Sequence, residues 1–185
     1  MRIIITGTTG LAKAIAGALA SDHSVKTTRI EDITMNDTTW WGFDQNDVLI
    51  NHAHMDFDQT KILEIAYRAW KKDSGKLIVN ISSRASQPNI SKGYLYASQK
   101  ASLNHLSNNL TYNSDKQCRI STINLGLLNH EDLPCLSYED VAIIIKSIIE
   151  MPHDIEVPEI TVQNSANYSE VQSDKETLKD IEWHG

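Results

Sequence analysis

Short apolar runs, rich in isoleucine, valine and leucine, recur along the chain, and each ends at a glycine or a polar residue. Such runs are too short for helices and are typical of strands buried on both faces, as in a parallel sheet. The second of them is the most polar. Together they predict strands at Arg2–Thr6, Val25–Ile30, Asp47–Asn51, Lys76–Ser82, Arg119–Leu125 and Glu159–Gln163.

Between these runs, apolar residues recur at the spacing of one helix face. The spacing predicts helices over Gly10–Leu19, Lys61–Lys72 and Tyr96–Leu110. A fourth helix is predicted to begin after Ser137, because an acidic residue follows this serine at the third position, as in a capping box. It is predicted to end before Pro152, since the residue ahead of a proline disfavours helix.

Strands that alternate with helices predict an α/β fold with a mainly parallel sheet. Right-handed crossovers then give a doubly wound, Rossmann-type sheet in three α/β/α layers. One connection, between Ile30 and Asp47, is short for a full crossover. It leaves room for a short third strand near Ile33–Met35 with little helix beside it.

The length of 185 residues predicts one domain. We expect it to cover residues 1–163, because the polar segment 164–185 resembles a C-terminal tail. A capping box at Ser173 and Glu176 predicts a short helix in that tail. The tail either is loosely attached or packs on its own or a neighbouring subunit.

The net charge of −7 argues against nucleic acid as a partner, because phosphate contacts need clustered lysine and arginine. No apolar run approaches the ~20 residues of a membrane span. The first residues lack the apolar stretch and cleavage site of a secretory signal. We therefore expect a cytoplasmic protein that meets neither membrane nor nucleic acid.

A glycine turn directly follows the first predicted strand. It contains Gly7, Thr8, Thr9, Gly10 and Leu11, and a helix follows. At this junction a doubly wound fold binds a dinucleotide: glycines allow the tight turn and close approach, and the helix N-terminus faces the pyrophosphate. Glycine turns also have purely structural uses, so this motif alone leaves both interpretations open.

Tyr96 and Lys100 stand four residues apart and share one face of the predicted third helix. Ser83 lies thirteen residues before Tyr96, at the end of a predicted strand, where side chains face the ligand crevice. A nearby ammonium is expected to lower the tyrosine pKa from about 10 and suit it to proton transfer. The alternative is an exposed Tyr/Lys helix face beside a strand-end serine.

In their order and spacing, these motifs resemble the short-chain dehydrogenase/reductase family over residues 1–163. The matching segments are ITGTTGLA, DVLINHA, KLIVNISS and YLYASQKAS, and SYEDVAIIIKSIIEMPHDIEVPEITVQ resembles the ending of many members. The resemblance implies a catalytic set of Ser83, Tyr96 and Lys100. It implies further NAD(P) contacts at Asn51, Ala53, Gly126 and Leu127, beside the glycine turn, Tyr96 and Lys100. It also implies a homodimer or homotetramer, joined through the helices at Lys61–Lys72 and Tyr96–Leu110.

The chain departs from the family at several points. The glycine turn is one residue shorter than the family's most common form, and His54 replaces a glycine after the family's fourth-strand position. We expect His54 to line the mouth of a pocket rather than to bind metal, because no third ligand is evident. The family's relay asparagine would fall near Phe57 and is missing, which leaves Asp56 or Asp58 as the remaining candidates for a relay. The segment Leu128–Leu136 is short for a substrate lid and implies an open pocket or closure by other parts.

Arg29 decides the expected cofactor. An acid at the end of the second strand would bind the ribose hydroxyl of NAD, whereas an arginine accommodates the additional phosphate of NADP. Arg29 falls at or next to this position, and Lys13 adds positive charge nearby. We therefore favour NADP(H), while Glu31 and Asp32 leave NAD(H) open.

The sequence thus predicts an oxidoreductase that transfers a hydride between NADP(H) and a small carbonyl or alcohol substrate, with Tyr96 as general acid/base. Two alternatives remain: an epimerase or dehydratase of the same family, and a non-catalytic dinucleotide sensor. Replacement of Tyr96 by phenylalanine separates an enzyme from a sensor. The residues give no signature of the substrate itself.

Overall fold

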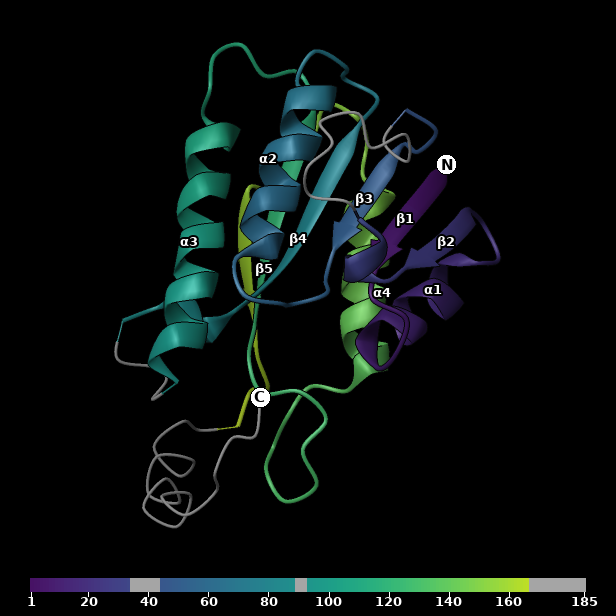
Figure 1. Cartoon of the computed structure of the whole chain (residues 1–185). Coiled ribbons are helices and arrows are strands. Elements are labelled where there is room, and N and C mark those ends of the chain that lie inside the picture. Colours follow the sequence, from purple (N-terminus) through teal and green to yellow (C-terminus); the bar gives the residue numbers. More distant parts are fainter. Residues whose placement is uncertain (34–43, 89–92, 167–185) are drawn as a thin grey trace.

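A computed structural model describes residues 1–33, 44–88 and 93–166 of the chain. Six of the described segments form one parallel sheet in the order β2-β1-β3-β4-β5-β6 (Figure 1). Its strands are β1 (Arg2–Thr6), β2 (Ser24–Thr28), β3 (Val48–Asn51), β4 (Leu77–Ser83), β5 (Arg119–Leu125) and β6 (Glu159–Val162).

Four α-helices in the described residues cover the two faces of the sheet. They are α1 (Leu11–Leu19), α2 (Asp58–Trp70), α3 (Tyr94–Thr111) and α4 (Tyr138–Ile149). Helices α1 and α4 pack together on one face, and α2 and α3 pack together on the other (Figure 1). The predicted doubly wound α/β fold is therefore confirmed.

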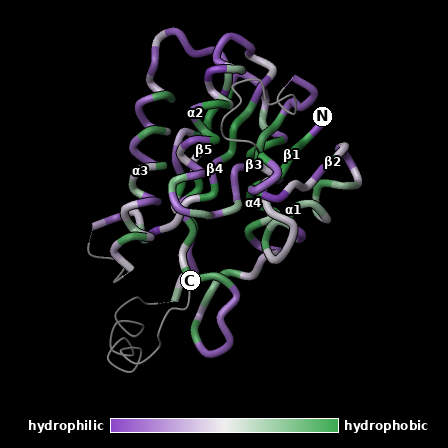
Figure 2. The backbone as a smooth tube through the Cα atoms, in the orientation of Figure 1, coloured by the Kyte–Doolittle hydropathy of each residue, from purple (hydrophilic) through white to green (hydrophobic). Residues whose placement is uncertain are grey.

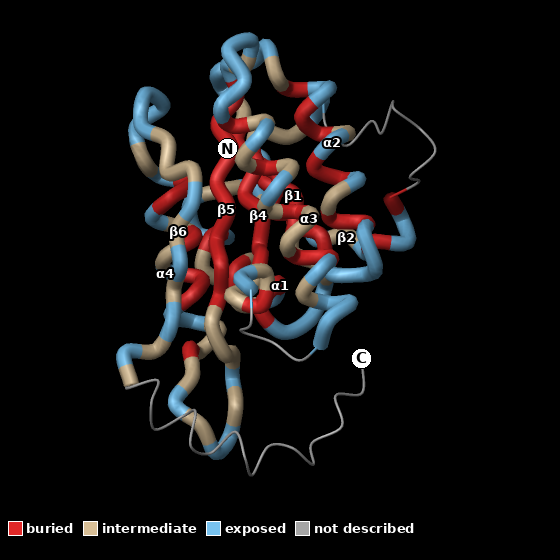
Figure 3. The backbone as a smooth tube through the Cα atoms, turned by 90° about the vertical axis from the view of Figure 1, so that its left-hand side faces the viewer, coloured by how far each residue is buried: buried red, intermediate tan, exposed pale blue. Residues whose placement is uncertain are grey.

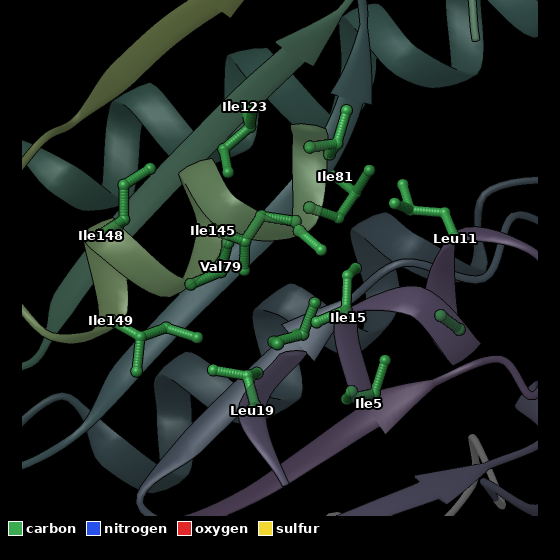
Figure 4. Close-up of a cluster of buried hydrophobic side chains, with 14 of the residues drawn as sticks. Ile5, Leu11, Ile15, Leu19, Val79, Ile81, Ile123, Ile145, Ile148 and Ile149 are labelled. Carbon is green, nitrogen blue, oxygen red and sulfur yellow. The ribbon is translucent and has the colours of Figure 1, made fainter. Parts of the chain in front are cut away.

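The core consists of two apolar clusters, one on each face of the sheet. Ile3 and Ile5 join the cluster under α1 and α4, while Ile4 joins the cluster under α2 and α3. This division follows from the two-residue period of a strand. Figure 2 shows hydrophobic residues along the central strands, Figure 3 shows that β1, β4 and β5 are buried, and Figure 4 shows the cluster under α1 and α4.

Most predicted element boundaries are confirmed within two or three residues, and β1 and β5 match their predictions. Helix α4 begins with the predicted capping box, in which Ser137 Oγ accepts from the Asp140 N–H at 3.0 Å. The second strand is shifted, because Ile30 buries its side chain in a short 3₁₀ turn, η1 (Ile30–Asp32), instead of continuing the strand. A further 3₁₀ turn, η2 (Arg84–Ser86), follows β4.

The predicted third strand is not supported at Ile33, which ends η1, and its remaining residues lie outside the described ones. The predicted helix at Ser173–Glu176 also lies outside them. Within residues 1–33, 44–88 and 93–166, none of the helices is both long and apolar enough to cross a bilayer.

Candidate functional site

The glycine turn joins β1 to α1 in a conformation that only glycine readily adopts. Gly7 has φ +102° and Gly10 has φ +52°. A side chain on Gly7 would place its Cβ 2.8 Å from Nδ1 of His52. The turn therefore depends on glycine both for its backbone angles and for the space beside His52.

The first turn of α1 is open to a ligand. No side chain caps this helix, and Thr8, Thr9 and Gly10 are exposed. An uncapped helix start presents N–H groups and a partial positive charge, and both favour a phosphate. Leu11 is only 3 % exposed and belongs to the core, so it can contribute its backbone but not its side chain.

At the carboxyl ends of β1 and β3 the chain changes from one face of the sheet to the other. The connection after β1 leads to α1, and the connection after β3 leads to α2 on the opposite face. Thr6 ties the two strand ends together, since its Oγ1 accepts from the N–H groups of His52 (2.8 Å) and Ala53 (2.9 Å). In doubly wound folds such a switch point is where ligands bind.

The three predicted catalytic residues meet at this same edge. Ser83 ends β4, Tyr96 lies in the first turn of α3, and Lys100 follows one turn later. Tyr96 is 38 % exposed and forms a hydrogen bond with the Ser83 side chain. The Lys100 side chain is 4 % exposed, and its Nζ lies 5.6 Å from the centre of the Tyr96 ring.

The segment 52–54 connects the predicted catalytic residues to the glycine turn. His52 packs over Gly7 at one end of this segment. At the other end, the ring of His54 meets the ring of Tyr96 edge-on, with centroids 4.9 Å apart and planes at 86°. His54 thus lies against Tyr96, and the segment 52–54 joins the tyrosine and the glycine turn into one candidate site.

Lys100 sits among neutral acceptors. Its Nζ donates to Oε1 of Gln59 at 2.6 Å and to the carbonyl oxygen of Ile81 at 3.0 Å. Burial lowers the pKa of Lys100 to about 7. An amine with such a pKa exchanges protons close to neutral pH.

The pKa of Tyr96 is shifted in the opposite direction from the one that the sequence predicts. Burial raises the pKa of Tyr96 above its ordinary 10, and the hydrogen bond with Ser83 acts in the opposite direction. The expected lowering of this pKa by Lys100 does not occur, because Lys100 Nζ is directed to Gln59 and Ile81. In this structure Tyr96 is therefore a neutral phenol at pH 7, suited to donate a proton.

Both histidines of the connecting segment are neutral at pH 7. Burial lowers the pKa of His52 by more than a hydrogen bond with Thr6 raises it, so the net shift is downward. Burial and, next in size, the charge of Lys100 lower the pKa of His54. The part of the chain that the structure describes contains no cluster of three or more residues of the His, Cys, Asp or Glu types that could hold a metal ion.

The side chain of Asn51, a predicted cofactor contact, lies inside the protein. The sequence predicts a cofactor contact, but Asn51 is fully buried, and its Nδ2 donates to the Gln59 carbonyl at 2.8 Å and to Asn80 Oδ1 at 3.0 Å. Its side chain therefore holds β3 against α2 and β4, beneath the site. Ala53 remains at the rim, because its N–H is bound to Thr6.

The outer candidates lie at the same sheet edge. Arg29 is exposed and directly follows β2, where the Thr28 carbonyl accepts from the Gly7 N–H at 2.7 Å. Gly126 directly follows β5, whose last residue pairs with Ser83. Leu127 begins a short loop that closes on itself, since its carbonyl accepts from the Leu136 N–H at 2.9 Å.

No protein-family model matches this sequence, and no curated protein matches it. Solved structures do match in fold. An alcohol dehydrogenase from the archaeon Thermococcus sibiricus, complexed with 5-hydroxy-NADP, has a TM-score of 0.74 at 15% identity and covers 90% of this chain and 97% of its own. A short-chain dehydrogenase/reductase from Vibrio parahaemolyticus has a TM-score of 0.70 at 13% identity, with 88% and 98% covered.

A third match is the 3-ketoacyl-(acyl-carrier-protein) reductase from Brucella melitensis, complexed with NADH. Its TM-score is 0.70 at 13% identity, and it covers 89% of this chain and 97% of its own. This chain has the short-chain dehydrogenase/reductase fold.

The two acids that the sequence left open for a proton relay, Asp56 and Asp58, both have partners in the structure. Asp58 is 7 % exposed and forms an ion pair with Lys61 at 2.9 Å, and Asp56 accepts from Gln99 at 3.4 Å. These two described acids therefore have partners other than Lys100. The residue that does bind Lys100 is Gln59.

Sequence reasoning missed Gln59, although its position gave a signal. Gln59 stands three residues before Ile62 and four before Leu63, and so continues the buried stripe of α2. An amide on an apolar stripe must find buried partners, because burying it without hydrogen bonds is costly. The partner could not be named, because it lies on another helix far along the chain.

Proposed function

We propose that this chain is an NADP(H)-dependent oxidoreductase of the short-chain dehydrogenase/reductase family, which interconverts a small carbonyl compound and its alcohol. The observation that supports this most is the gathering of Ser83, Tyr96 and Lys100 beside an open glycine turn. A purely structural Tyr/Lys face would not need a buried lysine below the tyrosine. Such burial is costly for a charged group, and it is typical of functional sites.

The residues present fit a nicotinamide dinucleotide. The exposed turn at Thr8, Thr9 and Gly10 and the uncapped start of α1 would hold the pyrophosphate. Gly126 and Leu127, next to the end of β4, would border the nicotinamide. When bound, the cofactor supplies or accepts the hydride.

The protein's own residues would handle the proton. Ser83 would hold the substrate oxygen, and Tyr96 would donate its phenolic proton to that oxygen as the hydride reaches the carbon. Since the pKa of Tyr96 is raised, the phenol is protonated at pH 7 and ready for the reductive direction. Lys100, with a pKa of about 7, would then return a proton to the tyrosine.

Arg29 supports the choice of NADP(H) over NAD(H). It is exposed beside the glycine turn, where the adenosine ribose is expected. Two of the structural neighbours hold different cofactors, 5-hydroxy-NADP in one and NADH in the other. The preference of this chain therefore rests on Arg29, with Glu31 and Asp32 as the alternative contacts.

Thermal unfolding with NADPH and with NADH over a concentration series tests the cofactor site. A ligand that binds only the folded state raises the midpoint by an amount that grows with RT ln(1 + [L]/Kd). We expect the larger rise with NADPH. No rise with either ligand would contradict the proposal.

The variant Tyr96→Phe tests the chemistry. We expect it to keep the thermal shift with NADPH and to lose about 10²–10⁴-fold in carbonyl reduction, because the proton donor is gone. If turnover is unchanged in Tyr96→Phe, Tyr96 is not the acid. If the wild type binds NADPH but turns over no carbonyl or alcohol, the sensor hypothesis replaces the enzyme.

We also propose that residues 1–163 form the NAD(P)-binding domain and that the chain assembles into a homodimer or homotetramer through α2 and α3. Both follow from the family resemblance. Sedimentation velocity at micromolar concentration tests the assembly, and a monomer there would refute it.

A further inference from the structure

The side chain of Gln59 has at least four hydrogen-bonding partners near the site. It is 2 % exposed and lies at the second position of α2, below the ends of β3 and β4. Its Nε2 lies within hydrogen-bonding distance of three carbonyl oxygens, those of Asn51 (2.9 Å), His52 (3.2 Å) and Ile81 (3.0 Å).

These three carbonyls fix which way the amide points. A carbonyl oxygen only accepts, so the NH₂ group of Gln59 must face it. The opposite orientation would put the amide oxygen against three other oxygens and the NH₂ group against an amine. Oε1 of Gln59 therefore faces Lys100 Nζ, at 2.6 Å.

None of the described titratable groups around Lys100 competes with Gln59 as a hydrogen-bonding partner of the Lys100 amine. His52 and His54 face it from the loop after β3, and both have lowered pKa values and are neutral at pH 7. Tyr96 faces it from its own helix as a neutral phenol. The acids Asp56 and Asp58 are bonded to Gln99 and Lys61 instead. None of these described groups gives Lys100 an ionised hydrogen-bonding partner.

We propose that Gln59 is a positioning residue, whose neutral side-chain carbonyl holds the Lys100 amine against β4 beside Tyr96 without fixing it in the ammonium form. The proposal rests on the proposed function, because it gives Lys100 its role in returning the proton to Tyr96. In that step the Lys100 ammonium loses one proton to the Tyr96 phenolate and regains one from water. An acid in place of Gln59 would hold the ammonium and oppose the step.

The titration of Lys100 tests the proposal. Lysine side chains are isotopically labelled and followed by NMR in the protein without cofactor or substrate, and the spectrum of Lys100→Arg identifies the Lys100 signal. In the wild type we expect a titration midpoint near the pKa of about 7. A wild-type midpoint at the ordinary lysine pKa of 10.5 would overturn the proposal without any further variant.

Two substitutions at Gln59 should move this midpoint in opposite directions. Gln59→Met removes the acceptor and should lower it by about one unit, because a hydrogen bond to the charged form is lost. Gln59→Glu keeps the shape and adds a charge, and should raise it by about 1–3 units. The pH dependence of kcat should shift in the same direction in each variant.

Gln99→Met is the matched control. It makes the same change at a buried glutamine next to Lys100 in the chain that, like Gln59, forms a side-chain hydrogen bond with His54. Gln99 bonds further to Asp56, whereas Gln59 bonds to Lys100. We expect an unchanged Lys100 midpoint in this variant. A shift as large as that in Gln59→Met would assign the effect to general packing and overturn the proposal.

Folding of each variant is checked by its dispersed backbone spectrum. If Gln59→Met does not fold, Gln59→Glu and the wild-type midpoint decide. If the folded Gln59 variants titrate as the wild type does, Gln59 does not act on Lys100. That result would leave the proposed function intact, because the proposed function fails only if NADPH gives no thermal shift or no turnover.

Discussion

Gly7→Ala should destabilise the protein through two separate costs. At φ +102°, an alanine is strained, and a left-handed backbone costs an ordinary residue about 1–2 kcal/mol. The new Cβ would also stand 2.8 Å from His52 Nδ1, which binds the Thr6 carbonyl at 3.2 Å. Moving the ring away forfeits that hydrogen bond, worth about 0.5–1.5 kcal/mol.

The two costs together predict a loss of about 1.5–3.5 kcal/mol in the free energy of unfolding. Urea denaturation followed by circular dichroism measures it directly. A thermal midpoint lower by about 3–14 °C should accompany it in a domain of this size.

Gly17→Ala is the control, because the same substitution lies within the same βα unit. Gly17 is inside α1, and a Cβ there would meet nothing within 4 Å. We expect a gain of about 0.5–1 kcal/mol, the helix propensity difference between glycine and alanine. If Gly7→Ala is as stable as the wild type while Gly17→Ala behaves as expected, the turn between β1 and α1 does not require glycine at position 7.

Three further outcomes are expected. Arg29→Ala should weaken NADPH binding about tenfold and leave NADH binding unchanged, since a charge-assisted hydrogen bond of about 1.5 kcal/mol is lost; equal losses for both cofactors, measured by thermal shift, would rule out the phosphate contact. Ser137→Ala should cost about 1 kcal/mol in urea denaturation by removing the cap of α4, whereas Ser147→Ala, at an exposed position inside the same helix, should cost little. Burial raises the pKa of Asp47, but the hydrogen bonds from Arg2 and its charge together lower this pKa by more, so the net pKa lies below 3.8. Asp47 therefore stabilises the fold above that pH, this stability is lost as the pH falls through the lowered pKa, and Asp47→Asn should flatten the acid limb of a stability–pH profile.

The elements of this fold could be predicted because hydrophobic pattern and local signals agree. The run of isoleucines at 3–5 predicts a strand buried on both faces, and the cap at Ser137 predicts where α4 begins. The end of β2 could not be predicted, because its polar residues carry no alternation and Ile30 is buried by tertiary contacts in η1. Short polar edge strands lack the pattern on which such predictions depend.

The candidate site, too, could be predicted from the sequence only in part. The meeting of Ser83 with Tyr96 was predictable, because strand ends of a parallel sheet share one edge. The direction of Lys100 was not, since it depends on Gln59, which lies forty-one residues earlier in the chain. The burial of Asn51 was not predictable either, because a polar residue at a strand end can face the crevice or the interior.

The late position of α4 in the chain has a consequence for synthesis on the ribosome. This helix covers the face of the sheet to which Ile3, Ile5 and Val79 belong. Until residue 149 has emerged, α1 is the one described helix that shields that face, and the nascent chain exposes isoleucine and valine to other chains. Partly made chains with exposed apolar surface are prone to associate. Ribosome-stalled chains that end before Ser137 should therefore bind chaperones longer than chains that include α4.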